Sequence, residues 1–122
     1  MLNKSDTGLI VVDVQGTLAS LVDDGRHVIT RIATLIKGAQ ALGLPILWLE
    51  QNPTKLGVTV PELTALLEPL RPIPKFTFNG CEDEVFSHAV TQANLGTWLL
   101  CGVEAHICVY QTSLGLREQG LN

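Results

Sequence analysis

The feature that most constrains the fold is an apolar run that passes directly into a helical pattern. Residues 97–102 read T-W-L-L-C-G, and after them Ala105, Cys108 and Val109 have the i, i+3, i+4 spacing of an amphipathic helix. A short apolar run of this kind is typical of a strand that is buried on both faces, as in a parallel sheet. We therefore expect a strand there, followed by a helix over about 105–119.

The same alternation occurs earlier in the chain. Residues 8–12 and 45–50 are apolar runs, and residues 27–42 between them carry apolar side chains on one helical stripe. A strand, a helix and a strand of these lengths form a right-handed crossover with parallel strands. Two more helices are expected over 62–68 and 82–93, and the polar segment between the second strand and the first of them reads as a loop. The pattern predicts an α/β domain.

Three chemically useful side chains lie at or just after predicted strand ends. Asp13 ends the first apolar run, Lys75 ends a short segment that its prolines restrict to an edge strand, and Cys108 follows the run at 97–102. The carboxyl ends of parallel strands share one edge of the sheet, so the three side chains can converge. Each also has a structural explanation: Asp13 as a cap, Lys75 as a solvated amine and Cys108 as a buried thiol.

A cysteine at the start of a helix is in a position that favours a reactive thiol. The first N–H groups of a helix lack internal partners and the helix dipole is positive there, so we expect a lowered pKa for the Cys108 thiol. The same N–H groups can receive a developing oxyanion. An adjacent carboxylate can take the proton of the thiol, and a lysine can hold that carboxylate in place.

Composition excludes several other classes of protein. The length of 122 residues fits one domain. A net charge of −4 without a cluster of Lys or Arg argues against nucleic acid as a partner. Three irregularly spaced cysteines form no disulfide framework, which favours the reducing cytoplasm. The chain has no signal peptide pattern and no apolar run of membrane-spanning length, so no membrane partner is expected.

The sequence resembles the isochorismatase-like cysteine hydrolases, a family that includes nicotinamidases. The resemblance rests on L-I-V-V-D-V-Q around Asp13, P-K-F-T-F around Lys75 and G-V-E-A-H-I-C ending at Cys108, in that order and at matching spacing. It covers essentially the whole chain. The segment 50–63, E-Q-N-P-T-K-L-G-V-T-V-P-E-L, further resembles the isochorismatase domain-containing proteins of bacteria and animals.

The resemblance implies a fold and a set of roles. The fold would be a three-layer α/β/α, Rossmann-like parallel sheet of order 3-2-1-4-5-6, of which the first four strands are visible and the last two are missing. Residues 1–122 would be a single hydrolase domain that is incomplete at its C-terminus, where a new strand begins at Leu121. Asp13, Lys75 and Cys108 would form a catalytic triad. A cis peptide bond between Val103 and Glu104 would direct the backbone N–H groups of Glu104 and Cys108 at the substrate oxygen.

The implied activity is hydrolysis of a small amide or related C–N bond through a thioester on Cys108. Where nicotinamidases carry an Asp-x-His metal site this chain reads E-Q-N, so we expect no metal and no cofactor. Candidate pocket walls are Trp48, Gln51 and Phe78. The expected partners are a small-molecule substrate and further copies of the chain in a homo-oligomer. The alternatives are a scaffold that binds without turnover and, more remotely, a redox role for the cysteines.

Overall fold

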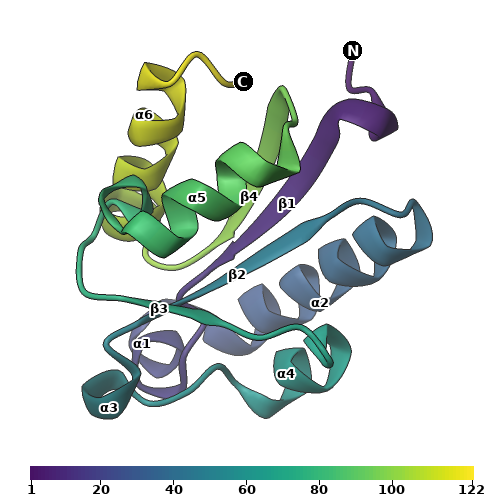
Figure 1. Ribbon diagram of the computed structural model, residues 1–122. Helices are drawn as coiled ribbons and strands as arrows, with labels where there is room; N and C mark the ends of the chain where they lie inside the picture. The colour runs from purple at the N-terminus through teal and green to yellow at the C-terminus, as the bar shows by residue number, and fades with distance from the viewer.

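The fold is built around β1, a strand whose six residues are all buried. The computed structural model covers residues 1–122, and Figure 1 shows β1 between β2 and β4. In chain order the elements are a 3₁₀ turn (Lys4–Asp6), β1 (Thr7–Val12), α1 (Gly16–Leu21), α2 (Gly25–Ala41), β2 (Ile46–Gln51), α3 (Pro53–Leu56), α4 (Pro61–Leu67), β3 (Ile73–Lys75), a second 3₁₀ turn (Gly80–Glu82), α5 (Glu84–Ala93), β4 (Thr97–Gly102), a π-helical turn (Ala105–Val109) and α6 (Tyr110–Glu118).

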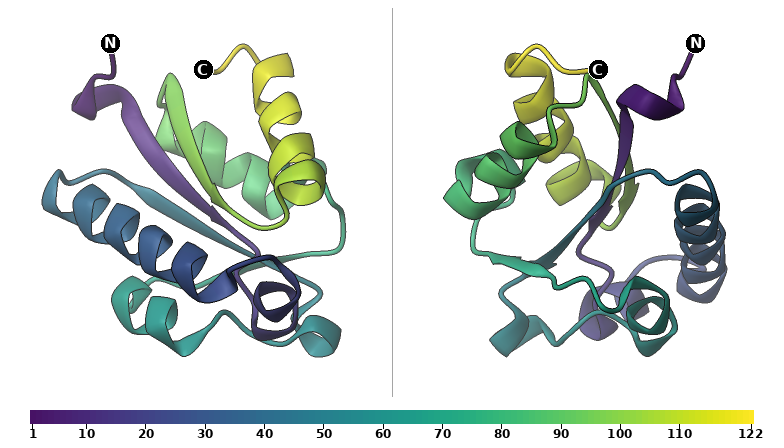
Figure 2. Two further views of the ribbon diagram at one scale, coloured as in Figure 1. Left: turned by 180° about the vertical axis from the view of Figure 1, so that it is seen from behind. Right: turned by 45° about the vertical axis from the view of Figure 1, so that its right-hand side comes forward.

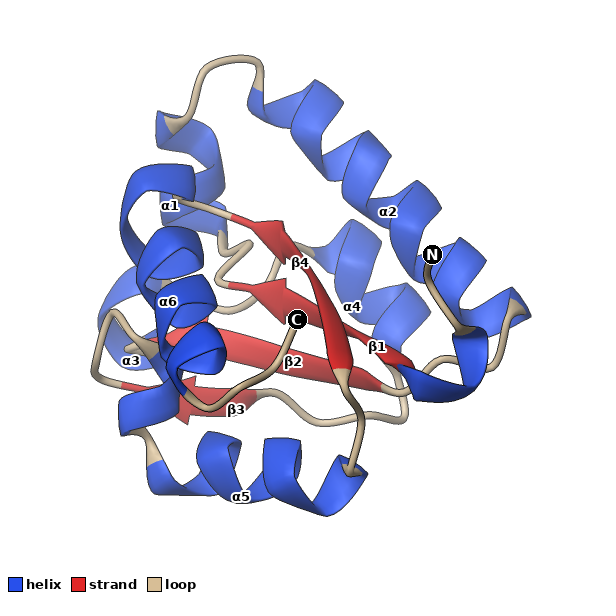
Figure 3. Cartoon of the chain, turned by 90° about the horizontal axis from the view of Figure 1, so that it is seen from above, coloured by secondary structure: helices blue, strands red, loops and turns tan.

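The four strands form one parallel sheet in the order β3-β2-β1-β4. This confirms the predicted fold class and the predicted position of β3 at an edge. Pro74 within β3 lacks the N–H that a central strand would use, which is why prolines are confined to edge strands. Figure 3 shows the strands crossing the molecule with helices on either side. β1 is apolar throughout because both of its faces are covered.

Each face of the sheet packs against its own set of helices (Figure 2). Side chains of α2 and α4, such as Ile36 and Leu63, cover one face of the sheet. They form one buried cluster with Leu9 and Val11 of β1. α5 and α6 cover the other face. The buried cluster on that side comprises Ile10, Val12, Leu49, Phe86, Val90, Trp98, Cys108 and Leu116.

The helices depart from the sequence prediction at three places. α3 lies in the segment after the second strand that we expected to be a loop, and it has only four residues. α1 lies where we predicted no helix, since it buries only Ala19 and so has no apolar stripe. The predicted helix over 105–119 begins with a π-helical turn and becomes regular at Tyr110. No helix combines the length and the apolar character that crossing a bilayer requires.

Leu121 and Asn122 lie along the outer edge of β4. The N–H of Asn122 donates to the carbonyl of Gly96 (2.9 Å), and its carbonyl accepts from the N–H of Trp98 (2.8 Å). Two such bonds on either side of Thr97 are the pattern of a parallel ladder. No strand is formed at Leu121 and Asn122 beyond these two bonds, so the strand that we expected to begin at Leu121 stays a prediction. That the domain continues into further strands stays a prediction.

Candidate active site

A buried ion pair joins the ends of β1 and β3. Lys75 Nζ lies 2.9 Å from Asp13 Oδ2, and neither side chain has any exposed surface. Asp13 has a φ of 54°, a left-handed conformation that Asp tolerates better than most residues. A non-glycine residue in this region directly after a buried strand is often a functional position. The ion pair carries the two charges of the predicted triad.

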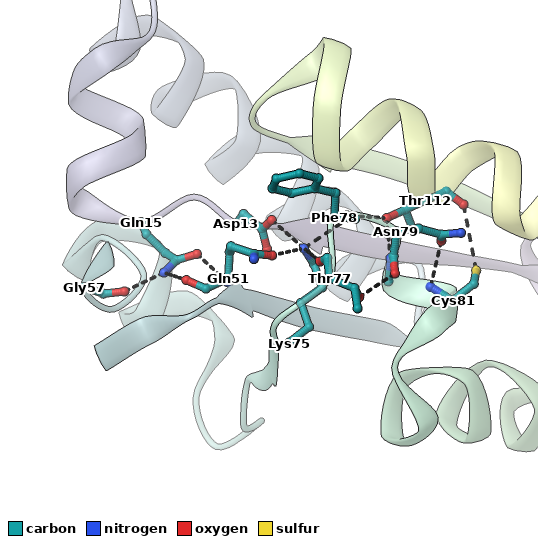
Figure 4. A network of polar contacts seen from close by, with 11 residues as sticks. Asp13, Gln15, Gln51, Gly57, Lys75, Thr77, Phe78, Asn79, Cys81 and Thr112 are labelled. Atoms are coloured by element: carbon teal, nitrogen blue, oxygen red, sulfur yellow. Dashed lines mark hydrogen bonds and ion pairs between the residues drawn. The ribbon is translucent and has the colours of Figure 1, made fainter. Parts of the chain in front are cut away.

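Lys75 uses all of its donors within the site (Figure 4). Besides Asp13, its Nζ donates to Oε1 of Gln51 (2.6 Å) and to the carbonyl of Thr77 (2.9 Å). The carbonyl of Phe78 lies at the limit of hydrogen-bonding distance, 3.5 Å away. Partners of this number and quality are what a buried ammonium group requires. Gln51, which we expected to line a substrate pocket, is thus bound to the lysine.

Gln15, which the sequence analysis did not single out, holds the neighbouring loops together. Its Oε1 accepts from the N–H of Gln51 (2.6 Å), and its Nε2 donates to the carbonyls of Gln51 (2.8 Å) and Gly57 (2.6 Å). The side chain is fully buried. Its position two residues after Asp13 places it near the sheet edge, but nothing in the local sequence indicates these contacts. Gln15 positions the end of β2 and, through Gln51, Lys75.

Cys108 lies in the π-helical turn that follows β4, and only 5% of it is exposed. Its thiol is close enough to Asp13 for a hydrogen bond, which lowers the pKa of the carboxyl group and raises that of the thiol. Oδ1 of Asp13 has no well-aligned hydrogen bond of its own. The structure therefore brings Asp13, Lys75 and Cys108 together at one edge of the sheet.

The expectation of a lowered pKa for the Cys108 thiol is wrong. Burial, then the hydrogen bond and negative charge of Asp13, raise the pKa to about 12, while Lys75 acts in the opposite direction. Burial also raises the pKa of Asp13, against the effect of Lys75. The start of a helix does not determine the protonation state here, because removal from water and a neighbouring carboxylate both disfavour the thiolate.

The backbone before Cys108 has two unusual features. The peptide bond between Val103 and Glu104 is cis, as the resemblance implied. Gly102 has a φ of 139°, and a Cβ there would overlap the carbonyl oxygen of Val12. The N–H of Glu104 makes no hydrogen bond. A cavity of about 390 Å³ lies beside these residues, between the π-helical turn and the junction of α1 with α2.

Thr112 links the lysine to the cysteine helix. Its hydroxyl accepts from the N–H of Gly80 (2.9 Å) and donates to the carbonyl of Phe78 (3.4 Å), in the loop whose carbonyls also receive Lys75. Thr112 is fully buried, on the inner face of α6. Figure 4 shows this connection between the loop after β3 and α6.

The other two predicted pocket residues lie apart from each other. Trp48 is buried among the side chains of α2 and α4, on the opposite face of the sheet from Cys108, so the structure does not bring it to the triad. Phe78 is 54% exposed, in the loop that receives Lys75. No group of three or more His, Cys, Asp or Glu side chains is arranged to hold a metal ion. All three cysteines are free thiols.

Comparison with known proteins identifies relatives along the whole chain. Residues 7–122 match the model of the isochorismatase domain. Human isochorismatase domain-containing protein 2 is 34% identical over 116 residues, which are 93% of this chain and 54% of that protein. The chain thus spans little more than half the length of this relative.

Several solved structures are similar to this chain in fold and in sequence. MAR1 ribonuclease from Caenorhabditis elegans has a TM-score of 0.88 and 36% identity, over 99% of this chain and 62% of that one. YcaC from Pseudomonas aeruginosa, solved with hexane-2,5-diol and covalent acrylamide, has a TM-score of 0.91 and 26% identity, with coverages of 99% and 62%. YcaC from Escherichia coli, an octameric hydrolase of unknown specificity, has a TM-score of 0.89 and 27% identity, with coverages of 99% and 61%. From the family match and these similarities, the chain belongs to the isochorismatase family.

Proposed function

We propose that the protein is a cysteine hydrolase that cleaves a small amide or related C–N bond through a thioester on Cys108. The observation that carries the proposal is the thiol of Cys108 beside the carboxylate of Asp13, which is bound to Lys75. This arrangement supplies a nucleophile, a base and a group that orients the base. A covalent acrylamide in a YcaC relative supports a reactive nucleophile and an amide-sized ligand in this fold.

The raised pKa of the thiol requires that the proton leaves during the attack. As the sulfur attacks the carbonyl carbon, the S–H proton passes to Oδ1 of Asp13, the C–S bond forms and the carbonyl electron pair moves to the oxygen. Backbone N–H groups of Glu104 and Cys108 would receive that oxyanion. The free N–H of Glu104 supports this role.

Collapse of the tetrahedral intermediate completes the reaction. The carbonyl re-forms, the C–N bond breaks, and Asp13 returns its proton to the leaving amine. Water then attacks the thioester, Asp13 accepts a proton from that water, and the carboxylic acid leaves as the sulfur regains its proton. Lys75 holds Asp13 in place throughout and limits how strongly its carboxyl group retains the proton.

The test is amide hydrolysis by purified protein and by single variants. Ammonia or amine release from a panel of small amides is measured together with the intact mass of the protein. We expect Cys108→Ala to abolish release and the mass adduct with acrylamide, and Asp13→Asn to reduce both by at least about 100-fold, the scale of general base catalysis. Cys81→Ala is the matched control and should behave as wild type. Release that persists in Cys108→Ala refutes the proposal.

The second candidate is a scaffold that binds without turnover. The buried thiol with its pKa raised to about 12 favours this alternative, because such a group is almost entirely protonated at neutral pH. The two candidates differ in the acrylamide adduct. In the hydrolase, the acrylamide adduct should form at Cys108, and its rate of formation should depend on Asp13. In the scaffold, the rate of adduct formation at Cys108 should not exceed that of a free cysteine.

We further propose a small-molecule substrate, a homo-oligomeric state and a reducing compartment. The octameric state of the E. coli YcaC relative supports the second of these, and the three free thiols support the third. Within the site, Phe78 and Gln51 are proposed to contact the substrate, Phe78 through its exposed ring and Gln51 through its place beside Lys75. Trp48 lies on the opposite face of the sheet from Cys108, so we do not propose that it contacts the substrate.

A further inference from the structure

A second recess lies across β2 from the triad. It has a volume of about 600 Å³ and is bounded by the end of β2, by α4 and by the segment that leads from α4 to β3. Successive side chains of a strand point to opposite faces, so Glu50 faces this groove while Gln51 faces Lys75. The groove is lined by Trp48, Glu50, Val58, Thr64, Glu68, Pro69, Leu70, Arg71 and Pro72.

Glu50 is held rigidly in the wall of the groove. Only 4% of the residue is exposed. Its Oε2 accepts from the N–H and the hydroxyl of Thr59, each at 2.8 Å. The Thr59 hydroxyl in turn accepts from the indole N–H of Trp48 at 2.7 Å. These three hydrogen bonds fix the orientation of the carboxylate.

The second carboxylate oxygen has a different environment. Oε1 of Glu50 makes no hydrogen bond. The only side-chain oxygen that is both buried and without a partner is Oδ1 of Asp13, so Oε1 of Glu50 is accessible to solvent. Arg71 also lines the groove but forms no ion pair with Glu50 or Glu68. The single ion pair of the structure joins Lys75 to Asp13. An almost fully buried carboxylate therefore presents one free acceptor to the groove.

The walls define what kind of ligand would bind this acceptor. Val58, Leu70 and the two prolines are apolar, whereas Glu68 adds a second negative charge. A buried carboxylate oxygen is best satisfied by a charged donor, and charge-assisted hydrogen bonds are about twice as strong as neutral ones. We propose that this groove binds a small organic cation, a primary ammonium group carried on an apolar body, with the ammonium group on Oε1 of Glu50.

The test is a titration with benzylamine followed by ¹H–¹⁵N NMR. It uses protein carrying Cys108→Ala, so that the outcome does not depend on the proposed hydrolase activity. We expect saturable shifts of the Trp48 indole and Thr59 amide signals. Glu50→Gln should weaken binding at least tenfold, whereas Glu62→Gln, which removes the same charge from an exposed position outside the groove, should leave it unchanged.

Two further measurements keep the proposal testable if Glu50→Gln fails to fold. Benzyl alcohol has a similar body without the charge and should not saturate. Val58→Trp changes a side chain that is 68% exposed at the mouth of the groove, so it should block benzylamine without disturbing the core. Equal binding of the amine and the alcohol, unchanged binding in Glu50→Gln or Val58→Trp, or shifts confined to residues around position 108 would overturn the proposal.

Discussion

Replacing Lys75 with methionine tests how the buried ion pair is held. Methionine has a similar length and fits an apolar environment, but it cannot donate the hydrogen bond that Lys75 Nζ gives to Oδ2 of Asp13. Oδ1 already lacks a well-aligned partner, and Asp13 has no exposed surface. Leaving one member of a buried pair uncompensated costs about 3–5 kcal/mol. Since single domains have unfolding free energies of about 5–15 kcal/mol, Lys75→Met should remove about a fifth or more of the total.

The assay is urea denaturation, followed by circular dichroism, at several pH values. Asp13 has a pKa that is raised even with Lys75 present, and removing the lysine raises it further. A raised carboxyl pKa means that the folded state binds the proton more tightly than the unfolded state. Relative to wild type, the unfolding free energy of Lys75→Met should therefore increase as the pH falls below the folded pKa and level off below the unfolded pKa, and it should not change with pH above the folded pKa.

The double variant Asp13→Asn with Lys75→Met supplies the decisive comparison. It contains neither charge, so it should recover most of the lost unfolding free energy and show no such pH dependence. Lys55→Met, at an exposed position, is the control for the substitution itself. If Lys75→Met costs less than about 1 kcal/mol, or if the double variant is no more stable than the single one, an uncompensated charge is not the cause of the loss.

Two more predictions concern the thiol and the glycines. At pH 8, a thiol with a pKa near 12 carries about a thousandfold less thiolate than one with the ordinary value of 9.0, so the ultraviolet thiolate absorbance of Cys108, measured as wild type minus Cys108→Ala, should appear only at a far higher pH than that of a cysteine in an unfolded peptide; absorbance that appears in the same pH range contradicts the raised pKa. Gly102→Ala should destabilise the protein by about 2 kcal/mol or more, because its positive φ and its contact with Val12 exclude a Cβ. Gly38→Ala, inside α2 with open space around it, should stabilise the protein by about 0.5–1 kcal/mol. Both glycine variants are compared with wild type by thermal denaturation, and a reversed order of stability would refute this explanation.

The positions of Asp13, Lys75 and Cys108 in the sheet could be predicted from the sequence because each lies at or after the end of a recognisable strand. An apolar run, Leu9 to Val12, identifies a strand buried on both faces, and the next residue is then at the carboxyl edge of the sheet. Gln15 could not be identified in this way. Its importance depends on hydrogen bonds to Gln51 and Gly57, which are 36 and 42 residues away in the chain. No local pattern encodes such a contact.

The direction in which the pKa of the Cys108 thiol is shifted could not be predicted from the local sequence either, because it depends on contacts made only in the folded protein. The sequence places Cys108 near a helix start, which favours the thiolate, but burial and Asp13 oppose it more strongly. Trp48 is a further case. The residue lies on the strand next to β1, and only the alternation of that strand in the folded sheet puts its indole in the opposite core.

The sequence by itself determined the α/β class, the parallel strands and the residues at their carboxyl ends. Hydrophobic periodicity and strand-end position are local properties, so they can be read without a fold. Tertiary structure alone decided which atoms meet: Lys75 with Gln51, Glu50 with Thr59, and Cys108 with a carboxylate 95 positions earlier, at Asp13. Burial and charge act through space, and their balance at the thiol exists only once the strands are assembled side by side.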